Sequence, residues 1–327
     1  MSVDAVVDQR TDVSIRAKLT FTAARLMLRP LLTHWPLTSV GMLPLSLIEV
    51  AAGLLPTPSG VRYEKVEFGG FTGEWVRPDT APEDSDGIVL YFHGGAFVTC
   101  GVATHRHSVS RIAEACRLPV LSVGYRQLPT VRLAGSVEDC LTVYRSVLAE
   151  GFAPERIVLA GDSAGGCLAF ATALAAAAEG LPRPAGIVAL SPWLDFDCAA
   201  KLVHPNAERD AYAPVQRLPL LAKLLGADPD LDPSISPVNG NLAGLPPVLL
   251  IASECEMLRC DAELMTERLA AADVPVTLQI WAGQVHAFPV LGDLLPESTA
   301  AIQEVGTFVR GLTSTATGSA EVAVLAG

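Results

Sequence analysis

The sequence predicts an α/β fold with a mostly parallel sheet and helices on both faces, and two observations lead to this prediction. First, short and nearly continuous apolar runs recur along the chain, and such runs are typical of strands buried on both faces. They occupy residues 88–92, 119–125, 156–161, 186–191, 247–253 and 276–283. Second, segments of helical length separate them, at residues 107–118, 137–150, 164–180 and 261–272. This alternation of strands and helices indicates a largely parallel sheet.

Two short strands precede this alternation. Residues 61–68 and 73–78 carry the β-forming residues, and the turn at Gly69–Gly70 predicts that they pair antiparallel. The domain that contains all of these elements is predicted to span residues 57–312.

Three further segments lie outside the alternation. Residues 1–56 mix cationic and apolar residues, and we expect them to form a helical N-terminal cap. Residues 196–240 are rich in Pro, Asp and Asn and predict a cap insertion over the carboxyl edge of the sheet, where folds of this class place their sites. Residues 313–327 are expected to form a disordered tail.

Charge and cysteine content limit the partners and cofactors. The net charge of −12 argues against nucleic acid or an anionic membrane as the main partner. The seven cysteines include no CxxC pair, so we expect no metal site and free thiols in a reducing compartment.

The N-terminal segment bears on location. It is interrupted early by the charged residues Asp4, Asp8 and Arg10. We therefore expect no signal peptide and a cytoplasmic protein. The apolar segment 37–56 is broken by polar and helix-breaking residues and is short for a membrane span. We interpret it as a core-facing or cap helix, with peripheral association at a membrane surface as the alternative.

Residues 161–165, GDSAG, match the pattern G-x-S-x-G between a predicted strand and a predicted helix. This context is that of a nucleophile elbow, in which a tight turn exposes the serine hydroxyl. Gly161 and Gly165 would allow the turn, and Asp162 would stabilise it. The alternative is a packing turn in which Ser163 only caps the helix.

Residues 93–97, HGGAF, follow the predicted strand 88–92. Their backbone N–H groups could stabilise an oxyanion, together with the N–H of Ala164. The candidate donors in the loop are Gly94, Gly95 and Ala96, and we expect His93 to hold the loop by a hydrogen bond.

A general base and an acid are expected later in the chain. His286 lies in a loop after the last predicted strand, which is where the base comes in this order of motifs. The acid would follow the strand 247–253, and the candidates are Glu254, Glu256 and Asp261. Asp261 also suits an N-cap of the helix 261–272. The histidines at 105 and 107 are expected to lie at the surface or in a pocket wall.

Seven motifs follow one another in an order that resembles the hormone-sensitive-lipase-like branch of the α/β-hydrolase fold. The resemblance covers about residues 60 to 311, and the motifs are HGGAF, YRQLP, EDC, GDSAGG, SPWLD, ECEMLRCDAE and GQVHAF. It implies an eight-stranded sheet with a helical cap. It also implies hydrolysis of carboxylic esters through an acyl-enzyme, with no metal or cofactor.

The resemblance further implies the roles of individual residues. Ser163 matches the nucleophile and His286 matches the base. The acid of the family stands at the head of a D/E-x-L-x-x-D/E pattern, which residues 256–261 fit. Glu256 is therefore the implied acid, with Glu254 as the second candidate.

The chain departs from the family pattern in three places. Ala96 stands where the family usually has a third glycine, and its methyl group could narrow the acyl pocket. Thr130 replaces a glutamate after the YRQLP motif, so the local anchoring must differ. A glutamate replaces the commoner aspartate as the acid.

The predicted substrates are small esters with short to medium acyl chains. Two alternatives stay open: hydrolysis of another acyl bond, such as an amide, carbamate or lactone, or ligand binding on a hydrolase scaffold without catalysis. The sequence does not define the oligomeric state, and a homodimer is one alternative.

Overall fold

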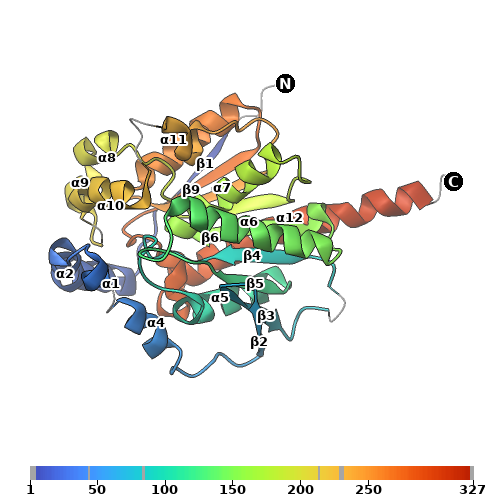
Figure 1. Cartoon of the computed structure of the whole chain (residues 1–327), viewed down its shortest axis with the longest axis horizontal. Coiled ribbons are helices and arrows are strands. Elements are labelled where there is room, and N and C mark those ends of the chain that lie inside the picture. Colours follow the sequence, from blue (N-terminus) through green and yellow to red (C-terminus); the bar gives the residue numbers. More distant parts are fainter. Residues whose placement is uncertain (1–4, 43–44, 83–84, 213, 228–231, 325–327) are drawn as a thin grey trace.

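The computed structural model describes residues 5–42, 45–82, 85–212, 214–227 and 232–324 (Figure 1). Its sheet has nine strands in the order β1-β9-β8-β7-β6-β4-β5-β3-β2. The strands are β1 (Val6–Arg10), β2 (Val61–Glu67), β3 (Thr72–Pro78), β4 (Ile88–Phe92), β5 (Val120–Gly124), β6 (Ile157–Asp162), β7 (Gly186–Leu190), β8 (Val248–Ser253) and β9 (Val276–Trp281). All neighbours pair parallel except β2 with β3 and β3 with β5, so the antiparallel pair predicted from the sequence is present.

Strand β1 corrects two predictions, because the N-terminal segment is not wholly helical and the sheet has nine strands instead of eight. β1 pairs parallel with β9, from Val6 opposite Thr277 to Arg10 opposite Trp281. It is an edge strand, and Val6 is exposed. Its side chains therefore lack the buried apolar pattern by which strands are recognised in a sequence.

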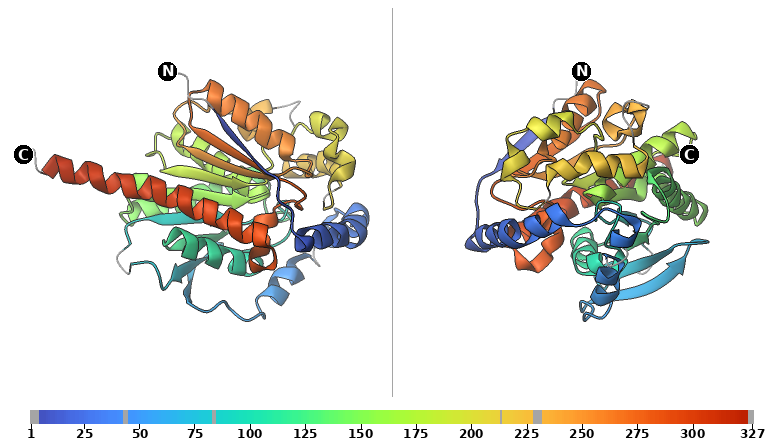
Figure 2. Two further views of the ribbon diagram at one scale, coloured as in Figure 1. Left: turned by 180° about the vertical axis from the view of Figure 1, so that it is seen from behind. Right: turned by 60° about the vertical axis from the view of Figure 1, so that its left-hand side comes forward.

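Helices cover both faces of the sheet (Figure 2). α5 (Val102–Cys116) and α12 (Pro296–Val324) pack on one face. The other face carries α6 (Leu133–Ala149), α7 (Ala164–Ala178) and α11 (Arg259–Ala271). Each face has its own apolar core, which explains why the central strands read as continuous apolar runs.

The C-terminal segment differs from the prediction of a disordered tail at 313–327. Helix α12 continues to Val324, and residues 325–327 lie outside the described part of the chain. Residues 313–324 contain no proline, so no residue in them forces the helix to end.

The cap consists of two segments that lie together at one end of the molecule (Figure 1). The N-terminal part contains α1 (Ile15–Ala23), the π-helix η1 (Ala24–Leu28), α2 (Arg29–His34), α3 (Ser39–Met42) and α4 (Ser46–Ala52). The insertion contains α8 (Ala199–Val203), α9 (Asn206–Arg209), η4 (Val215–Arg217), α10 (Leu218–Leu225), η5 (Pro233–Ile235) and η6 (Pro237–Asn239). Arg29 joins the two segments, because it donates to the carbonyl oxygens of Ala207 and Asp210.

A buried ion pair attaches the insertion to the main domain. The ammonium group of Lys201 on α8 lies 2.8 Å from the carboxylate of Asp261 on α11, and both side chains are buried. Asp261 also accepts hydrogen bonds from the N–H groups of Leu194 and Asp195. The sequence predicted Asp261 as the N-cap of its helix. This prediction is wrong, because Leu258 holds that position.

Replacement of Lys201 tests the contribution of this ion pair. In Lys201→Met the Asp261 carboxylate would stay buried without its cation, so we expect the free energy of unfolding to fall by about 3–5 kcal/mol. Denaturant titration measures the change. The control is Arg145→Met, which removes a partly exposed cation from Glu138 and Glu179 and should change stability by less than about 1 kcal/mol. Equal effects of the two substitutions would contradict the role of the buried pair.

Candidate active site

Ser163 lies at the turn between β6 and α7, and its backbone is strained, with φ 52° and ψ −114°. The neighbouring glycines are required by close contacts between backbones. A Cβ atom on Gly165 would lie 1.8 Å from the carbonyl oxygen of Phe92, and one on Gly161 would lie 2.6 Å from the same oxygen. The pattern G-x-S-x-G therefore serves a tight turn against the end of β4, and the Ser163 side chain stays partly exposed.

The structure brings Ser163, His286 and Glu256 into one hydrogen-bonded chain. The Ser163 Oγ atom lies 2.9 Å from His286 Nε2, and His286 Nδ1 lies 2.6 Å from Glu256 Oε2. The N–H of Ser253, at the end of β8, donates to the second carboxylate oxygen of Glu256 at 2.7 Å. The carboxylate is thus fixed by the strand that precedes it.

Of the acids left open by the residues alone, Glu256 is the one that contacts the histidine. Its side chain is fully buried. The side chain of Glu254 is 37% exposed and lies 3.5 Å from Arg209 instead. Asp261 is committed to Lys201.

The environment of His286 suits a general base. Burial by itself lowers its pKa, but the hydrogen bond and negative charge of Glu256 outweigh burial and raise the pKa above the ordinary value of 6.5. A raised pKa strengthens the affinity of the neutral imidazole for the proton that a general base takes up.

The insertion holds the loop that carries Glu256. The side-chain amide of Asn206 donates to the carbonyl oxygens of Glu254 and Glu256. The carboxylate of Asp210 accepts from the N–H of Met257 at 2.9 Å. No sequence pattern marks these two supporting residues, because only the fold brings the insertion to this loop.

The loop after β4 contains N–H groups that suit an oxyanion. Among the described residues, the structure shows no protein acceptor for the N–H groups of Gly95, Ala96 and Ala164. Gly94 differs from the prediction, because its N–H donates to Asp162 Oδ1 at 2.9 Å and is not available to a ligand. Its role is to attach the loop to the elbow.

Backbone conformation explains the residue types in this loop. A Cβ atom on Gly95 would lie 2.0 Å from the carbonyl oxygen of Thr99, so only glycine fits there. Ala96 has φ 56°, a left-handed conformation that is uncommon for an L-residue. Ala96 thus keeps the N–H of the third position, at the cost of backbone strain.

Asp162 and His105 form a buried pair beneath this loop. The Asp162 carboxylate accepts from Tyr91 Oη and the Gly94 N–H, and His105 Nε2 lies 3.3 Å from it. Burial alone would raise the pKa of Asp162, but His105 lowers it overall, and Asp162 likewise raises the pKa of His105. The expected surface or wall position is therefore wrong for His105, which lies buried on α5, while His107 is exposed.

The other motifs hold the same loop. His93 Nδ1 lies 2.7 Å from the carbonyl oxygen of Gly94, and Tyr125 Oη donates to the carbonyl oxygen of His93. The segment after Tyr125 is anchored by Arg126, which donates to the buried carboxylate of Asp139. This pair connects the YRQLP and EDC motifs.

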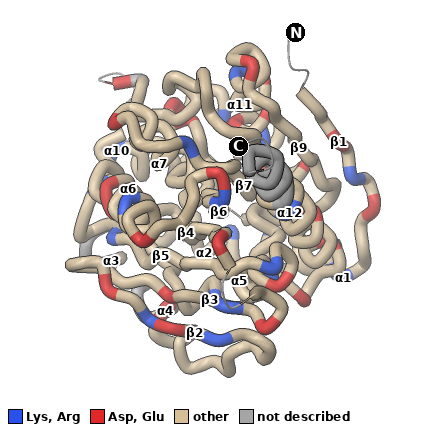
Figure 3. Tube along the Cα trace, turned by 90° about the vertical axis from the view of Figure 1, so that its right-hand side faces the viewer, with Lys and Arg blue, Asp and Glu red and all other residues tan. Residues whose placement is uncertain are grey.

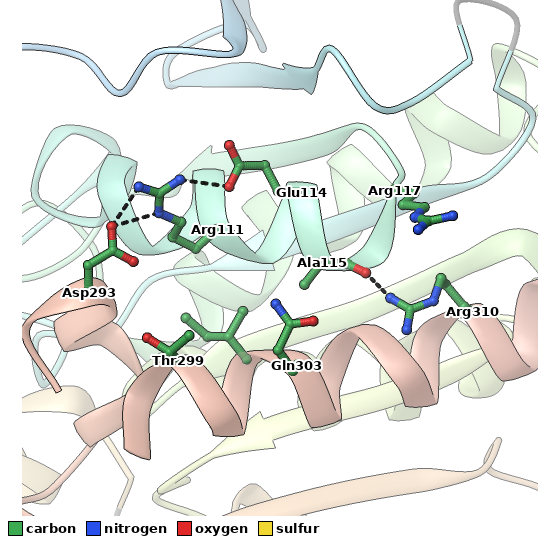
Figure 4. A pocket seen from close by; sticks show the side chains of 9 residues that line it. Arg111, Glu114, Ala115, Arg117, Asp293, Thr299, Gln303 and Arg310 are labelled. Carbon is green, nitrogen blue, oxygen red and sulfur yellow. Dashed lines mark hydrogen bonds and ion pairs between the residues drawn. The ribbon is translucent and has the colours of Figure 1, made fainter. Parts of the chain in front are cut away.

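A polar pocket of about 230 Å³ lies elsewhere, between α5 and α12 (Figure 4). Two of its three cations have partners: Arg111 contacts Asp293 and Glu114, and Arg310 donates to the carbonyl oxygen of Ala115. None of the three residues of the hydrogen-bonded chain lines it. In the described residues there is also no group of His, Cys, Asp and Glu that could hold a metal ion.

Comparisons with known proteins agree with this geometry. The family model of the alpha/beta hydrolase fold matches residues 89–290. The chain is 35% identical over 310 residues to the carboxylesterase/phospholipase LipF of Mycobacterium tuberculosis, covering 92% of this chain and 83% of that protein. It is 37% identical to an acetyl-hydrolase of Streptomyces hygroscopicus, covering 80% of this chain and 86% of the relative.

A solved structure of an esterase from the bacterial hormone-sensitive lipase family superposes with a TM-score of 0.81 at 32% identity. The match covers 92% of this chain and 99% of that chain. The fold, the motifs and the comparisons agree, and the chain belongs to the hormone-sensitive-lipase-like esterases of the α/β-hydrolase family.

Proposed function

We propose that the protein is a serine carboxylesterase that hydrolyses esters with short to medium acyl chains through an acyl-enzyme on Ser163. One observation carries the proposal: a continuous hydrogen-bonded chain joins Glu256, His286 and Ser163 beside a loop whose N–H groups have no acceptor among the residues that the structure describes. Each part is needed for acyl transfer, and together they define the reaction class.

In the first half of the reaction, Ser163 Oγ attacks the ester carbonyl carbon while its proton passes to His286 Nε2. The N–H groups of Gly95, Ala96 and Ala164 stabilise the negative charge on the carbonyl oxygen. Glu256 stabilises the imidazolium form of His286. When the intermediate collapses, the alkoxide leaves with the proton from His286 and the acyl group stays on Ser163.

In the second half, water repeats the sequence. His286 takes a proton from water, and the oxygen attacks the acyl carbon. The same N–H groups stabilise the new oxyanion. The carboxylic acid then leaves, and His286 returns the proton to Ser163.

Side chains near the nucleophile support short to medium acyl chains. The ring of Tyr212 lies 6.0 Å from that of His286, and the methyl group of Ala96 occupies the oxyanion loop. We expect both side chains to reduce the space beside Ser163. The complete triad speaks against the alternative of a ligand-binding protein without catalysis, and amides, carbamates and lactones belong in the substrate panel.

A cytoplasmic location is part of the proposal. All seven cysteines are unpaired, which fits a reducing compartment. The described residues contain no helix that is long and apolar enough to cross a membrane. Cell fractionation tests the location.

Ser163→Ala tests the nucleophile. We expect kcat to fall on the order of 10⁶-fold, because the covalent step is lost. The measurement is hydrolysis of p-nitrophenyl esters from acetyl to palmitoyl, and the wild type should be most active on the shorter half of the series. Ser146→Ala, at a surface position on α6, is the matched control. Full activity of Ser163→Ala would refute the proposal.

Glu256→Gln tests the acid and the pH dependence. His286 acts as a base only when neutral, so kcat/KM of the wild type should rise with pH through a pKa above 6.5. Without the negative charge, we expect kcat to fall roughly 10⁴-fold and the rise to move to lower pH. Glu254→Gln is the control and should keep the wild-type profile. The reverse result would assign the acid to Glu254.

His105 tests the support of the oxyanion loop. His105→Leu leaves the buried Asp162 carboxylate without its histidine partner, so Gly94 and the loop should lose their position. We expect kcat to fall roughly 10- to 100-fold, less than for loss of a full oxyanion donor, with little change in KM.

Two further variants make the test of His105 specific. His105→Gln can still donate to Asp162 and should recover part of kcat. His107→Leu, on the exposed side of the same helix, should behave like the wild type. A change in KM alone in His105→Leu would contradict this role.

A further inference from the structure

The cap carries an exposed apolar ridge along its first helical segment, α1–η1–α2. Five large side chains form the ridge, each between 51% and 76% exposed: Ile15, Leu19, Leu26, Met27 and Leu31. Their spacing of mostly four or fewer residues, with one gap of seven, places them on one side of a continuous helical segment. An apolar helix face without a protein partner marks an interaction surface.

The ridge belongs to a larger concentration of apolar side chains on the cap. Of the sixteen large apolar side chains found exposed among the described residues, thirteen lie on the two cap segments. Outside the ridge these are Leu47, Ile48, Val50, Leu54, Leu55, Leu202, Val203 and Leu220. Figure 3 views the molecule from the side away from the cap and shows acidic and basic residues interspersed along the trace there.

Charge indicates which partner fits the ridge. Residues 15–55 contain four Lys and Arg and one Asp or Glu, although the whole chain has a net charge of −12. Arg16 and Lys18 are exposed and flank the ridge on opposite sides of α1. Apolar residues flanked by cations are typical of helices that lie in the interface of an anionic bilayer. Self-association through this face is disfavoured, because it would place the cations of one copy against those of the other.

The cap also contacts the loops of the active site. Glu49 on α4 accepts from the N–H groups of Ala103 and Thr104 at the start of α5. Thr99, just after the oxyanion loop, donates to the carbonyl oxygen of Leu45. The insertion holds the loop of Glu256. The ridge and Ser163 therefore lie on elements gathered at the same end of the sheet.

We propose that the ridge docks the protein on the surface of an anionic phospholipid bilayer, and that the active site takes ester substrates from that surface. The uptake of ester substrates from the surface rests on the proposed esterase function. The docking itself is argued only from the ridge and its charges. The ridge would enter the boundary between headgroups and acyl chains, and Arg16 and Lys18 would contact the lipid phosphates.

Vesicle binding by the full chain tests the docking. The variant is the triple substitution Leu19→Gln, Leu26→Gln and Met27→Gln, because glutamine keeps the helix propensity while removing apolar area. The wild type should co-float with vesicles of equal parts phosphatidylcholine and phosphatidylglycerol. The triple variant should bind them at least about a hundredfold more weakly. Val6→Gln, on the edge strand β1 outside the cap, is the matched control and should bind as the wild type does.

The charges are tested separately. The double variant Arg16→Gln and Lys18→Gln should bind the same vesicles roughly 30-fold more weakly. Added salt should weaken binding of the wild type more than that of this variant. Equal binding of the wild type to pure phosphatidylcholine would refute the part of the proposal that concerns anionic lipid.

Two ester substrates separate failure of docking from failure of the esterase. The triple variant should hydrolyse soluble p-nitrophenyl acetate as the wild type does, and lose about tenfold or more on an ester embedded in the anionic vesicles. If the wild type hydrolysed neither ester, the proposed esterase function would be refuted, and the vesicle-binding result would still decide the docking. Hydrolysis without vesicle binding would overturn the docking alone. A dimer of the wild type that the triple variant loses, without vesicle binding, would assign the ridge to self-association.

Discussion

The close approach of the turn after β6 to the end of β4 is the constraint on which the active site depends. Gly165 and Gly161 allow the backbone of this turn to contact the carbonyl oxygen of Phe92. That contact places Ser163 beside the loop that begins one residue after Phe92. Asp162, within the same turn, then binds the N–H of Gly94 and fixes the loop. The hydroxyl group of Ser163 and the N–H groups of the loop thus owe their relative position to this backbone contact and to the hydrogen bond of Asp162, and a side chain at Gly165 would separate them.

The cap shows a second level of organisation, because the same segments cover the site and support it. Arg29 joins the N-terminal helices to the insertion, and Asn206 and Asp210 bind the loop that carries Glu256. Lys201 ties the insertion to α11 through a buried ion pair. Displacement of the cap would therefore also move the loop that carries Glu256.

Sequence patterns predicted two kinds of feature: strands that share a repeated apolar pattern, and turns whose backbone geometry only glycine allows. The six continuous apolar runs became strands because burial on both faces demands such runs, and G-x-S-x-G marked the elbow because only glycine fits there. Strand β1 was not predicted, since its edge position leaves no buried pattern. The hydrogen bond from the N–H of Gly94 to Asp162 and the pairing of Asp162 with His105 were not predicted either. Both contacts join residues that are far apart in the sequence and that only the fold brings together. The residues alone also left Glu254 and Glu256 open, because they are two positions apart and only the fold shows which one faces His286.

The most direct test of the central claim is to identify the atom that carries the acyl group. The protein would be treated with a fluorophosphonate, which forms a stable adduct with activated serines, and the labelled peptide would be mapped by mass spectrometry. We expect one adduct per chain, on Ser163, and loss of labelling when His286 is replaced by alanine. A labelled residue other than Ser163 in a protein that still hydrolyses esters would contradict it.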